Sequence, residues 1–179
     1  MDSGTVLEGK VNGIPMFANI EDALLNLSSV PDQFIYGIAP ADAFLKENER
    51  NVILEAMKQG MNIVNPLQEF LTDDEQFVQA ALQYGVEIED VRMPPLKKDL
   101  HLFSGRILHI DTPIVAVLGT DGAVGKRTTS VILEAALQAK GLKVAFIATG
   151  QTGLIQGAKY GVAIDAIPSQ YITGEIENE

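Results

Sequence analysis

Cysteine is absent from this 179-residue chain. The protein therefore has no disulfide, no thiolate metal site and no cysteine nucleophile. The absence is consistent with a reducing compartment, and we expect the protein to be cytoplasmic. The start of the chain, MDSGTVLEGK, also lacks the basic and then apolar segments of a signal peptide.

Basic residues are scarce: 13 Lys and Arg face 24 Asp and Glu, a formal net charge of −11 at pH 7. A chain this acidic repels nucleic-acid phosphates and anionic membrane surfaces, so we expect neither as a partner. Long apolar runs are missing too, since none approaches the roughly 18 residues that a membrane span requires. Hydrophobic residues still make up 46% of the sequence, which is enough for a globular core.

The first half of the chain alternates short apolar runs with segments of helical periodicity. Such alternation with short connections predicts an α/β fold, a parallel sheet with helices on its faces. Strands are predicted at residues 14–18, 33–39, 61–65 and 86–92, and helices at residues 20–27, 41–59 and 72–84. Asn19 is the expected N-cap of the first of these helices. Thr72 and Glu75 form a predicted capping box for the third.

Residues 93–99, MPPLKKD, interrupt the pattern with two prolines and two lysines. We place a domain boundary here, giving domains 1–98 and 99–179. In the second domain we expect strands at 106–110, 114–118 and 143–148 and a helix at 126–140. A phosphate-loop domain normally has further strand–helix units and an acidic strand beyond these. We therefore expect the chain to be a piece of a longer protein.

The second domain contains a glycine loop between an apolar run and a helical pattern, VAVLGTDGAVGKRTTSVILEA. A loop that enters a helix N-terminus presents free amide groups and the positive end of the helix dipole. Gly119, Gly122 and Gly125 allow a close approach to phosphate oxygens, and Lys126 adds a charge. The predicted phosphate or cofactor site comprises Gly119, Thr120, Gly122, Ala123, Val124, Gly125, Lys126, Arg127, Thr128 and Thr129.

Arg127 occupies the position where the usual phosphate loop has Ser or Thr. That hydroxyl normally binds Mg²⁺, which a guanidinium cannot do, although it can bind a second phosphate. The requirement for Mg²⁺ is therefore open, and a ligand with separated phosphates, such as the adenosine part of coenzyme A, is compatible with the loop. The alternative is that Arg127 is a solvated helix residue.

The motif GTDGAVGK, residues 119–126, is similar to the phosphate loop of dethiobiotin synthetases. The longer phrases GTDGAVGKRTTS, ATGQTG and GVAIDAIPSQYITGEIE resemble the D-glutamate N-acetyltransferase family, formerly a domain family of unknown function. GIPMFANIEDAL, GMNIVNPLQEFL and DLHLFSGRI resemble the other domain of that family. The resemblance implies a Rossmann-like domain, with its first strand missing here, followed by a partial P-loop NTPase-type domain.

The resemblance also implies a function, the transfer of an acetyl group from acetyl-CoA to the amine of D-glutamate. Asp121, the one carboxylate inside the loop, is the candidate catalytic base or amine ligand; the alternative is a loop-shaping Asx turn. Thr149, Gln151 and Thr152 follow a predicted strand, where α/β ligand crevices lie, and are substrate-binding candidates. Their alternative is a polar turn.

The remaining polar candidates are better explained as structural. Asp165 and Glu175 are expected to be structural acids, and Arg92 and Arg106 to form salt bridges rather than to bind a ligand carboxylate. The two histidines, His101 and His109, do not form a metal site, and we expect none.

Two other functions remain open. The chain could be an ATPase or ligase like dethiobiotin synthetase, which would use Mg²⁺–ATP, or a truncated protein that binds a phosphate ligand without chemistry. The expected partner is a small molecule, and acetyl-CoA or ATP is the expected cofactor. Related P-loop proteins pair across their phosphate sites, so a homo-oligomer, a dimer by analogy, is also expected.

Overall fold

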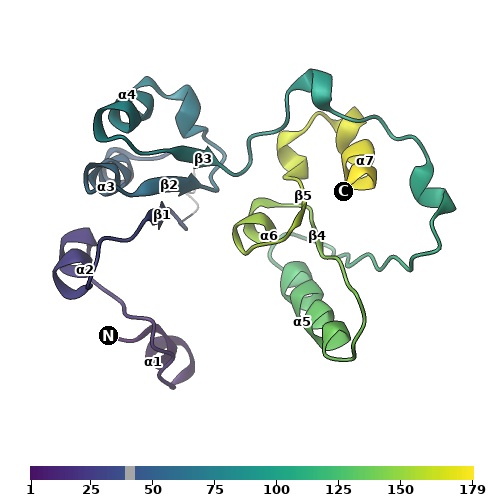
Figure 1. Cartoon of the computed structure of the whole chain (residues 1–179), viewed down its shortest axis with the longest axis horizontal. Helices are drawn as coiled ribbons and strands as arrows, with labels where there is room; N and C mark the ends of the chain where they lie inside the picture. The colour runs from purple at the N-terminus through teal and green to yellow at the C-terminus, as the bar shows by residue number, and fades with distance from the viewer. Residues whose placement is uncertain (39–42) are drawn as a thin grey trace. The chain divides into compact units, whose positions relative to one another are not determined.

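The computed structural model describes residues 1–38 and 43–179 of the chain (Figure 1). They divide into two compact units, Met1–Asp90 and Val91–Glu179. The predicted boundary at residues 98 and 99 stays a prediction. No helix in the described residues is both long enough and apolar enough to cross a membrane.

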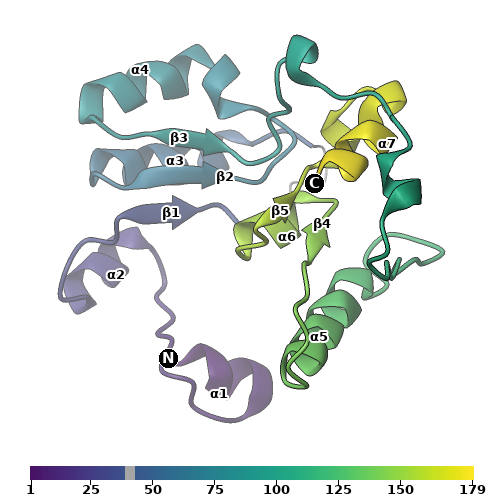
Figure 2. The ribbon, with the colours of Figure 1, turned by 45° about the vertical axis from the view of Figure 1, so that its right-hand side comes forward.

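The first unit contains a parallel three-stranded sheet in the order β1-β2-β3. The strands are β1 (Gln33–Ile35), β2 (Asn62–Asn65) and β3 (Ile88–Asp90), and Ile63 of β2 lies between Phe34 and Ile88. Helices α3 (Glu47–Lys58) and α4 (Glu75–Tyr84) make the two crossovers and pack against each other. Right-handed crossovers between strands in sequential order place both helices on one face of the sheet (Figure 2).

The core of the first unit lies between these helices and the sheet. It is a single apolar cluster drawn from α3, β2, α4 and the connecting loops. Its buried members are Tyr36, Leu45, Ile53, Ala56, Met57, Met61, Ile63, Leu67, Leu71, Phe77, Ala80 and Val86. The helical spacing of the apolar residues in α3 and α4 explains why one face of each helix is buried and the other is in solvent.

The sequence predicted several of these elements correctly. Helix α2 (Ile20–Asn26) is present, and the Asn19 side chain caps it by accepting a hydrogen bond from the Asp22 amide at 2.8 Å. Strands β1, β2 and β3 fall within their predicted ranges but are shorter. The end of the predicted strand at residue 39 lies outside the described residues.

Other predictions for the first unit were wrong. Residues 14–18 form no strand; Pro15 makes only an isolated bridge to Asp2, which follows from the turn built around helix α1 (Ser3–Glu8). Helix α3 begins at Glu47, later than predicted, because the Leu45 amide donates to the Glu69 carboxylate at 2.9 Å instead of entering the helix. Residues 41 and 42 of the predicted helix lie outside the described residues.

The predicted capping box of α4 was also wrong. Asp74 is the N-cap, and its side chain accepts from the Gln76 amide at 2.9 Å. Thr72 lies in the 3-10 turn η1 (Leu71–Asp73), where its amide and hydroxyl both donate to Asp90. The Thr72 hydroxyl, which the local sequence pattern assigned to the cap of α4, thus donates instead to the carboxylate of the distant Asp90.

The second unit contains helix α5 (Lys126–Gln138) and a short parallel pair, β4 (Ile147–Ala148) and β5 (Tyr160–Gly161) (Figure 1). Helix α6 (Gln151–Ile155) connects the two strands and contacts both. The prediction of α5 is confirmed apart from its last two residues. The strand predicted at 143–148 pairs only at its end.

Two predicted strands of the second unit were wrong. Residues 106–110 contain a 3-10 helix, η3 (Arg106–His109), because the Leu108 amide bonds back to the Gly105 carbonyl at 3.1 Å. Residues 114–118 form no strand and pair with none within the described part of the chain. Their apolar periodicity is real, yet Ile114, Val115 and Leu118 are exposed.

Two carboxylates of helix α7 (Ser169–Asn178) accept hydrogen bonds from residues 101–107 of the second unit. Glu177 accepts from the Ser104 amide and hydroxyl at 2.6 and 2.7 Å and from the Ile107 amide at 3.1 Å. Buried Glu175 accepts from the His101 amide. Gly174 lets the helix approach so closely that a Cβ there would lie 2.1 Å from the His101 carbonyl oxygen.

Candidate functional site

The glycine loop spans residues 119–125 and leads directly into α5. Gly125 precedes the helix with φ of 92°, a left-handed conformation that suits glycine, and Ala123 also has a positive φ of 52°. Among the residues that the structure describes, no side chain caps the N-terminus of α5. In the described structure the amides of Ala123, Val124 and Gly125 have no hydrogen-bond partner, and these residues are exposed. The loop thus offers free amide donors to an anion.

Gly119 and Lys126 approach each other across the loop. A Cβ on Gly119 would lie 2.7 Å from Val124 Cγ2 and 3.0 Å from Lys126 Cδ. A larger residue at 119 would therefore push the lysine stem and the loop apart. The Lys126 ammonium donates to the Asp121 carbonyl oxygen, so it is folded back over the loop.

Asp121, the candidate base, uses its carboxylate within the loop. Its Oδ1 accepts from the Gly122 amide at 2.6 Å. This bond joins neighbouring residues, whereas an Asx turn joins residues two apart, so the alternative interpretation of Asp121 as an Asx turn is not met among the described residues. The carboxylate is exposed, and its second oxygen is left for other partners.

The three residues after Lys126 differ in the contacts of their side chains. The Arg127 guanidinium donates to the Gln156 side-chain oxygen, while the Thr129 hydroxyl donates to the Gly125 carbonyl at 3.0 Å. The Thr128 hydroxyl has no partner among the described residues, and Thr128 is exposed. Thr128 is therefore the hydroxyl that is free at the start of α5.

The candidates Thr149, Gln151 and Thr152 lie between β4 and the first turn of α6. They follow the carboxyl end of β4, as expected, but no hydrogen bond joins them to the glycine loop in the described residues. Gln156, the residue that follows α6, instead contacts Arg127 in the first turn of α5, and it is not among the residues predicted from the sequence. No local pattern in the sequence marks Gln156 as a contact of Arg127.

The contacts of the other polar residues are structural, but the described residues show the expected salt bridge for Arg92 alone and not for Arg106. Arg92, which is buried, forms an ion pair with Asp165 inside the second unit. Arg106 donates from Nε to the Ser104 hydroxyl at 3.1 Å. The His101 ring lies 3.0 Å from Glu175. The described residues contain no group of His, Asp and Glu that could hold a metal ion.

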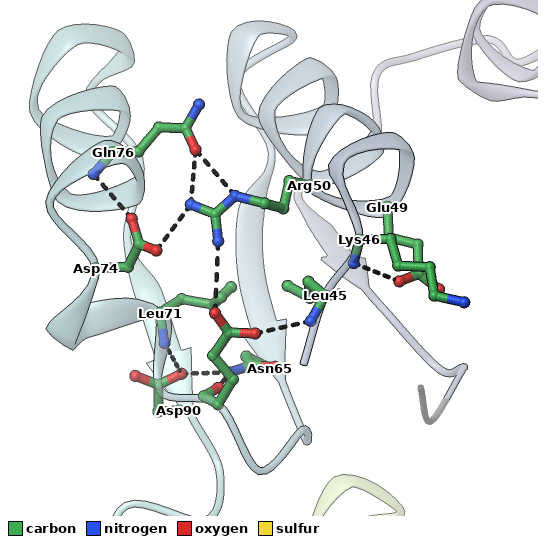
Figure 3. A network of polar contacts seen from close by, with 10 residues as sticks. Leu45, Lys46, Glu49, Arg50, Asn65, Leu71, Asp74, Gln76 and Asp90 are labelled. Atoms are coloured by element: carbon green, nitrogen blue, oxygen red, sulfur yellow. Dashed lines mark hydrogen bonds and ion pairs between the residues drawn. The ribbon is translucent and has the colours of Figure 1, made fainter. Parts of the chain in front are cut away.

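A second polar cluster lies at the carboxyl ends of β2 and β3 in the first unit (Figure 3). Asp90 ends β3 and accepts from the Asn65 side chain at 2.6 Å, the Leu71 amide at 3.0 Å and the Thr72 amide and hydroxyl at 2.9 and 2.5 Å. Asn65 is completely buried, and its amide group also donates to the Glu69 carbonyl at 2.7 Å. The Asp90 carboxylate is thus saturated by protein donors and holds the loop after β2 closed.

Arg50 completes this cluster from α3. It lies 2.7 Å from Asp74 and 3.4 Å from Glu69, and its guanidinium stacks 4.5 Å from the centre of the Phe77 ring. Gln76 accepts a further 2.6 Å hydrogen bond from it (Figure 3). Ligands of α/β sheets bind at this edge, but here the charged groups satisfy one another. The glycine loop is therefore the better candidate site.

The two units define an α/β protein that combines a parallel-sheet unit with a glycine-loop unit of the P-loop class. The chain belongs to the DUF1611 family. Residues 1–94 match its N-terminal model, described as a Rossmann-like domain of unknown function, and residues 101–179 match its C-terminal model, described as a P-loop domain. The expected fold class and the family resemblance are both confirmed.

Two curated relatives carry the name D-glutamate N-acetyltransferase. The protein from Pseudoalteromonas sp is 34% identical over 146 residues, which are 81% of this chain and 42% of the relative. The protein from Tritonibacter scottomollicae is 29% identical over 143 residues, 80% of this chain and 41% of the relative.

A solved structure extends the likeness to the whole fold. The crystal structure of a DUF1611 family protein from Anabaena variabilis superimposes with a TM-score of 0.85 at 31% sequence identity. It covers 97% of this chain, whereas this chain covers 49% of it. The chain therefore spans less than half the length of the relatives that it matches.

Proposed function

We propose that this chain binds acetyl-CoA through the glycine loop and takes part in acetyl transfer to the amine of D-glutamate. The observation that carries the proposal is the loop of residues 119–126, whose free amides and lysine can hold a diphosphate. The names of the two relatives supply the acceptor and the reaction. Because the chain spans less than half of each relative, the complete activity is part of the proposal.

The reaction requires no covalent enzyme intermediate. The neutral amine of D-glutamate attacks the thioester carbonyl, the carbon–nitrogen bond forms, and the carbon–sulfur bond breaks. The ammonium loses its proton to a base, and the departing thiolate of CoA is protonated. Holding the thioester beside the amine supplies much of the rate enhancement, and amide donors can stabilise the oxyanion. Asp121 is the proposed base, through the carboxylate oxygen that Gly122 does not bind.

The use of Mg²⁺–ATP is the competing function, favoured by the likeness of GTDGAVGK to a ligase loop. It is weakened by Arg127, which stands at the usual Mg²⁺ position and donates to Gln156. A cation ligand must donate an electron pair, and a guanidinium has none to give.

Calorimetry on the 179-residue chain separates these functions. Acetyl-CoA should bind without Mg²⁺, and D-glutamate should bind more tightly in its presence. Binding of ATP that depends on Mg²⁺, with none of acetyl-CoA, would contradict the proposal. Binding of acetyl-CoA without production of N-acetyl-D-glutamate would indicate a chain that binds the donor but does not catalyse transfer alone.

The loop itself is tested with Lys126→Ala. The loss of a charge-assisted hydrogen bond to phosphate should raise the Kd for acetyl-CoA by roughly 10- to 100-fold. Lys140→Ala is the matched control, because Lys140 is exposed and lies beyond the opposite end of α5. Unchanged affinity in Lys126→Ala would rule out this loop as the phosphate site.

A further inference from the structure

The two neighbouring cations at the start of α5 are bonded only to neutral oxygens. Lys126 donates to the Asp121 backbone carbonyl, and Arg127 donates to the Gln156 side-chain amide. Among the described residues, neither forms an ion pair. Carboxylates are abundant in a chain with 24 Asp and Glu and a net charge of −11.

Two of the three other arginines are paired with carboxylates, while Arg106 donates to the Ser104 hydroxyl. Arg50 contacts Glu69 and Asp74, and Arg92 contacts Asp165. A neutral partner such as Gln156 orients a guanidinium without cancelling its charge. Two uncompensated cations side by side repel each other, and the positive end of the helix dipole adds to that repulsion. An anionic ligand would reduce both the repulsion between the two cations and their repulsion from the helix dipole.

The two cations are directed to different places. The Lys126 ammonium lies over the glycine loop, whereas Arg127 reaches the residue that ends α6, 29 positions further along the chain. One of the five guanidinium donors is used by Gln156, so the planar group keeps donors for a phosphate. The arrangement suits a ligand that carries two anionic groups apart from each other.

We infer that Arg127, positioned by Gln156, binds a second phosphate of the ligand, separate from the diphosphate held by the loop and Lys126. This inference rests on the proposed function and sharpens it: the ligand is a nucleotide with a diphosphate and a ribose 3′-phosphate. In acetyl-CoA, the 3′-phosphate on the ribose is that second group. The arginine thereby distinguishes CoA esters from nucleotides that have only a 5′-phosphate chain.

The test compares CoA with 3′-dephospho-CoA, which differs only by that phosphate, by calorimetry on the full chain. CoA should bind about 10- to 100-fold more tightly, the range expected for charge-assisted hydrogen bonds to one phosphate. Arg127→Ala should bring the ratio of the two Kd values close to one while the affinity for 3′-dephospho-CoA stays unchanged. Arg127→Lys should keep part of the preference, because it keeps the charge but loses the planar fork.

Gln156 is tested by the same ratio. Gln156→Ala should lower the preference for CoA, and Gln156→Glu should lower it further because the new carboxylate neutralises Arg127. Gln138→Ala, at the far end of α5, is the matched control and should leave the ratio unchanged. A purely structural glutamine would weaken both ligands equally and leave the ratio intact, which would overturn its role as a positioning residue.

The outcomes distinguish this inference from the proposed function. Equal affinity of the wild-type chain for the two ligands would overturn the inference and leave acetyl-CoA binding in place. Absence of binding to either ligand would overturn both. A ratio that persists in Arg127→Ala would show that another group recognises the 3′-phosphate.

Discussion

The two units of the chain bury their apolar residues to very different extents. In the first unit, Ile53, Met57 and Phe77 are completely buried between two helices and a sheet. In the second, the buried apolar residues of the described structure are Ala148, Ala163 and Ile167, and α5 buries none of its side chains. The first unit is therefore stabilised mainly by its apolar core, and the second by hydrogen bonds and close backbone approaches.

The largest effect is expected from the core of the first unit. Phe77→Ala should lower the free energy of unfolding of this unit by about 3–5 kcal/mol, because it removes a fully buried ring and leaves a cavity. Hydrogen exchange at the β2 amides measures it. Ile132→Ala, on exposed α5, should change the second unit by less than about 0.5 kcal/mol. If Ile132→Ala lowered the free energy of unfolding as much as Phe77→Ala does, the two units would not differ in their dependence on an apolar core.

The next effect concerns the polar cluster of the first unit. Asp90→Asn keeps the shape of the side chain but replaces an acceptor oxygen with a donor facing the Asn65, Leu71 and Thr72 donors. The loss should be about 1.5–3 kcal/mol, measured by urea unfolding followed by hydrogen exchange. Glu89→Gln, at an exposed neighbouring position of β3, is the control. Equal stability of both variants would contradict the structural role of Asp90.

A smaller effect tests the close approach of α7. Alanine normally stabilises a helix by up to about 1 kcal/mol relative to glycine. Gly174→Ala should instead destabilise the second unit by about 1–3 kcal/mol, because its Cβ would collide with the His101 carbonyl. Gly150→Ala meets no atom within 4 Å and serves as the control. Thermal unfolding, together with hydrogen exchange at the amides of residues 101–107, measures the change. A gain in stability in Gly174→Ala would show that α7 can move away from His101.

The smallest effect is a pH dependence in the second unit. Desolvation raises the pKa of Glu177, but hydrogen bonds from Ser104 and Ile107, with the charge of Arg106, outweigh it and lower the pKa from 4.5 to about 2. Stability from this group is thus fully present above pH 4.5 and is lost as the pH falls toward about 2. Carboxyl NMR titration measures the pKa directly. Ser104→Ala should raise it, and a titration near 4.5 in the wild type would contradict the contact.

The sequence predicted elements well where the signal is local. The apolar spacing of α4 and α5 and the cap at Asn19 need no information from distant residues. The Thr72 cap was wrong because Asp90, 18 residues away, takes its hydroxyl. The strand at 114–118 was wrong because apolar character does not reveal whether a pairing strand is present.

The same division between local and long-range features applies to the candidate site. The glycines, Lys126 and the start of α5 follow from a short motif, since loop and helix are adjacent in sequence. The bond from Arg127 to Gln156 joins positions 29 apart, and no periodicity connects them. The use of Asp121 as both a backbone acceptor for Lys126 and a side-chain acceptor for Gly122 depends on the turn, which the residue types alone do not fix.

The absence of a side-chain cap on α5 in the described structure would give the proposed ligand a structural role of its own. Gly125 precedes the helix and has no side chain that could accept a hydrogen bond, so the first amides of α5 lack an acceptor in the described structure. A phosphate in the loop would be that acceptor, the group that a serine or aspartate supplies in other helices. Binding of the proposed phosphate and the satisfaction of the first amides of α5 would then be one equilibrium, in which the ligand supplies the cap of the helix that binds it.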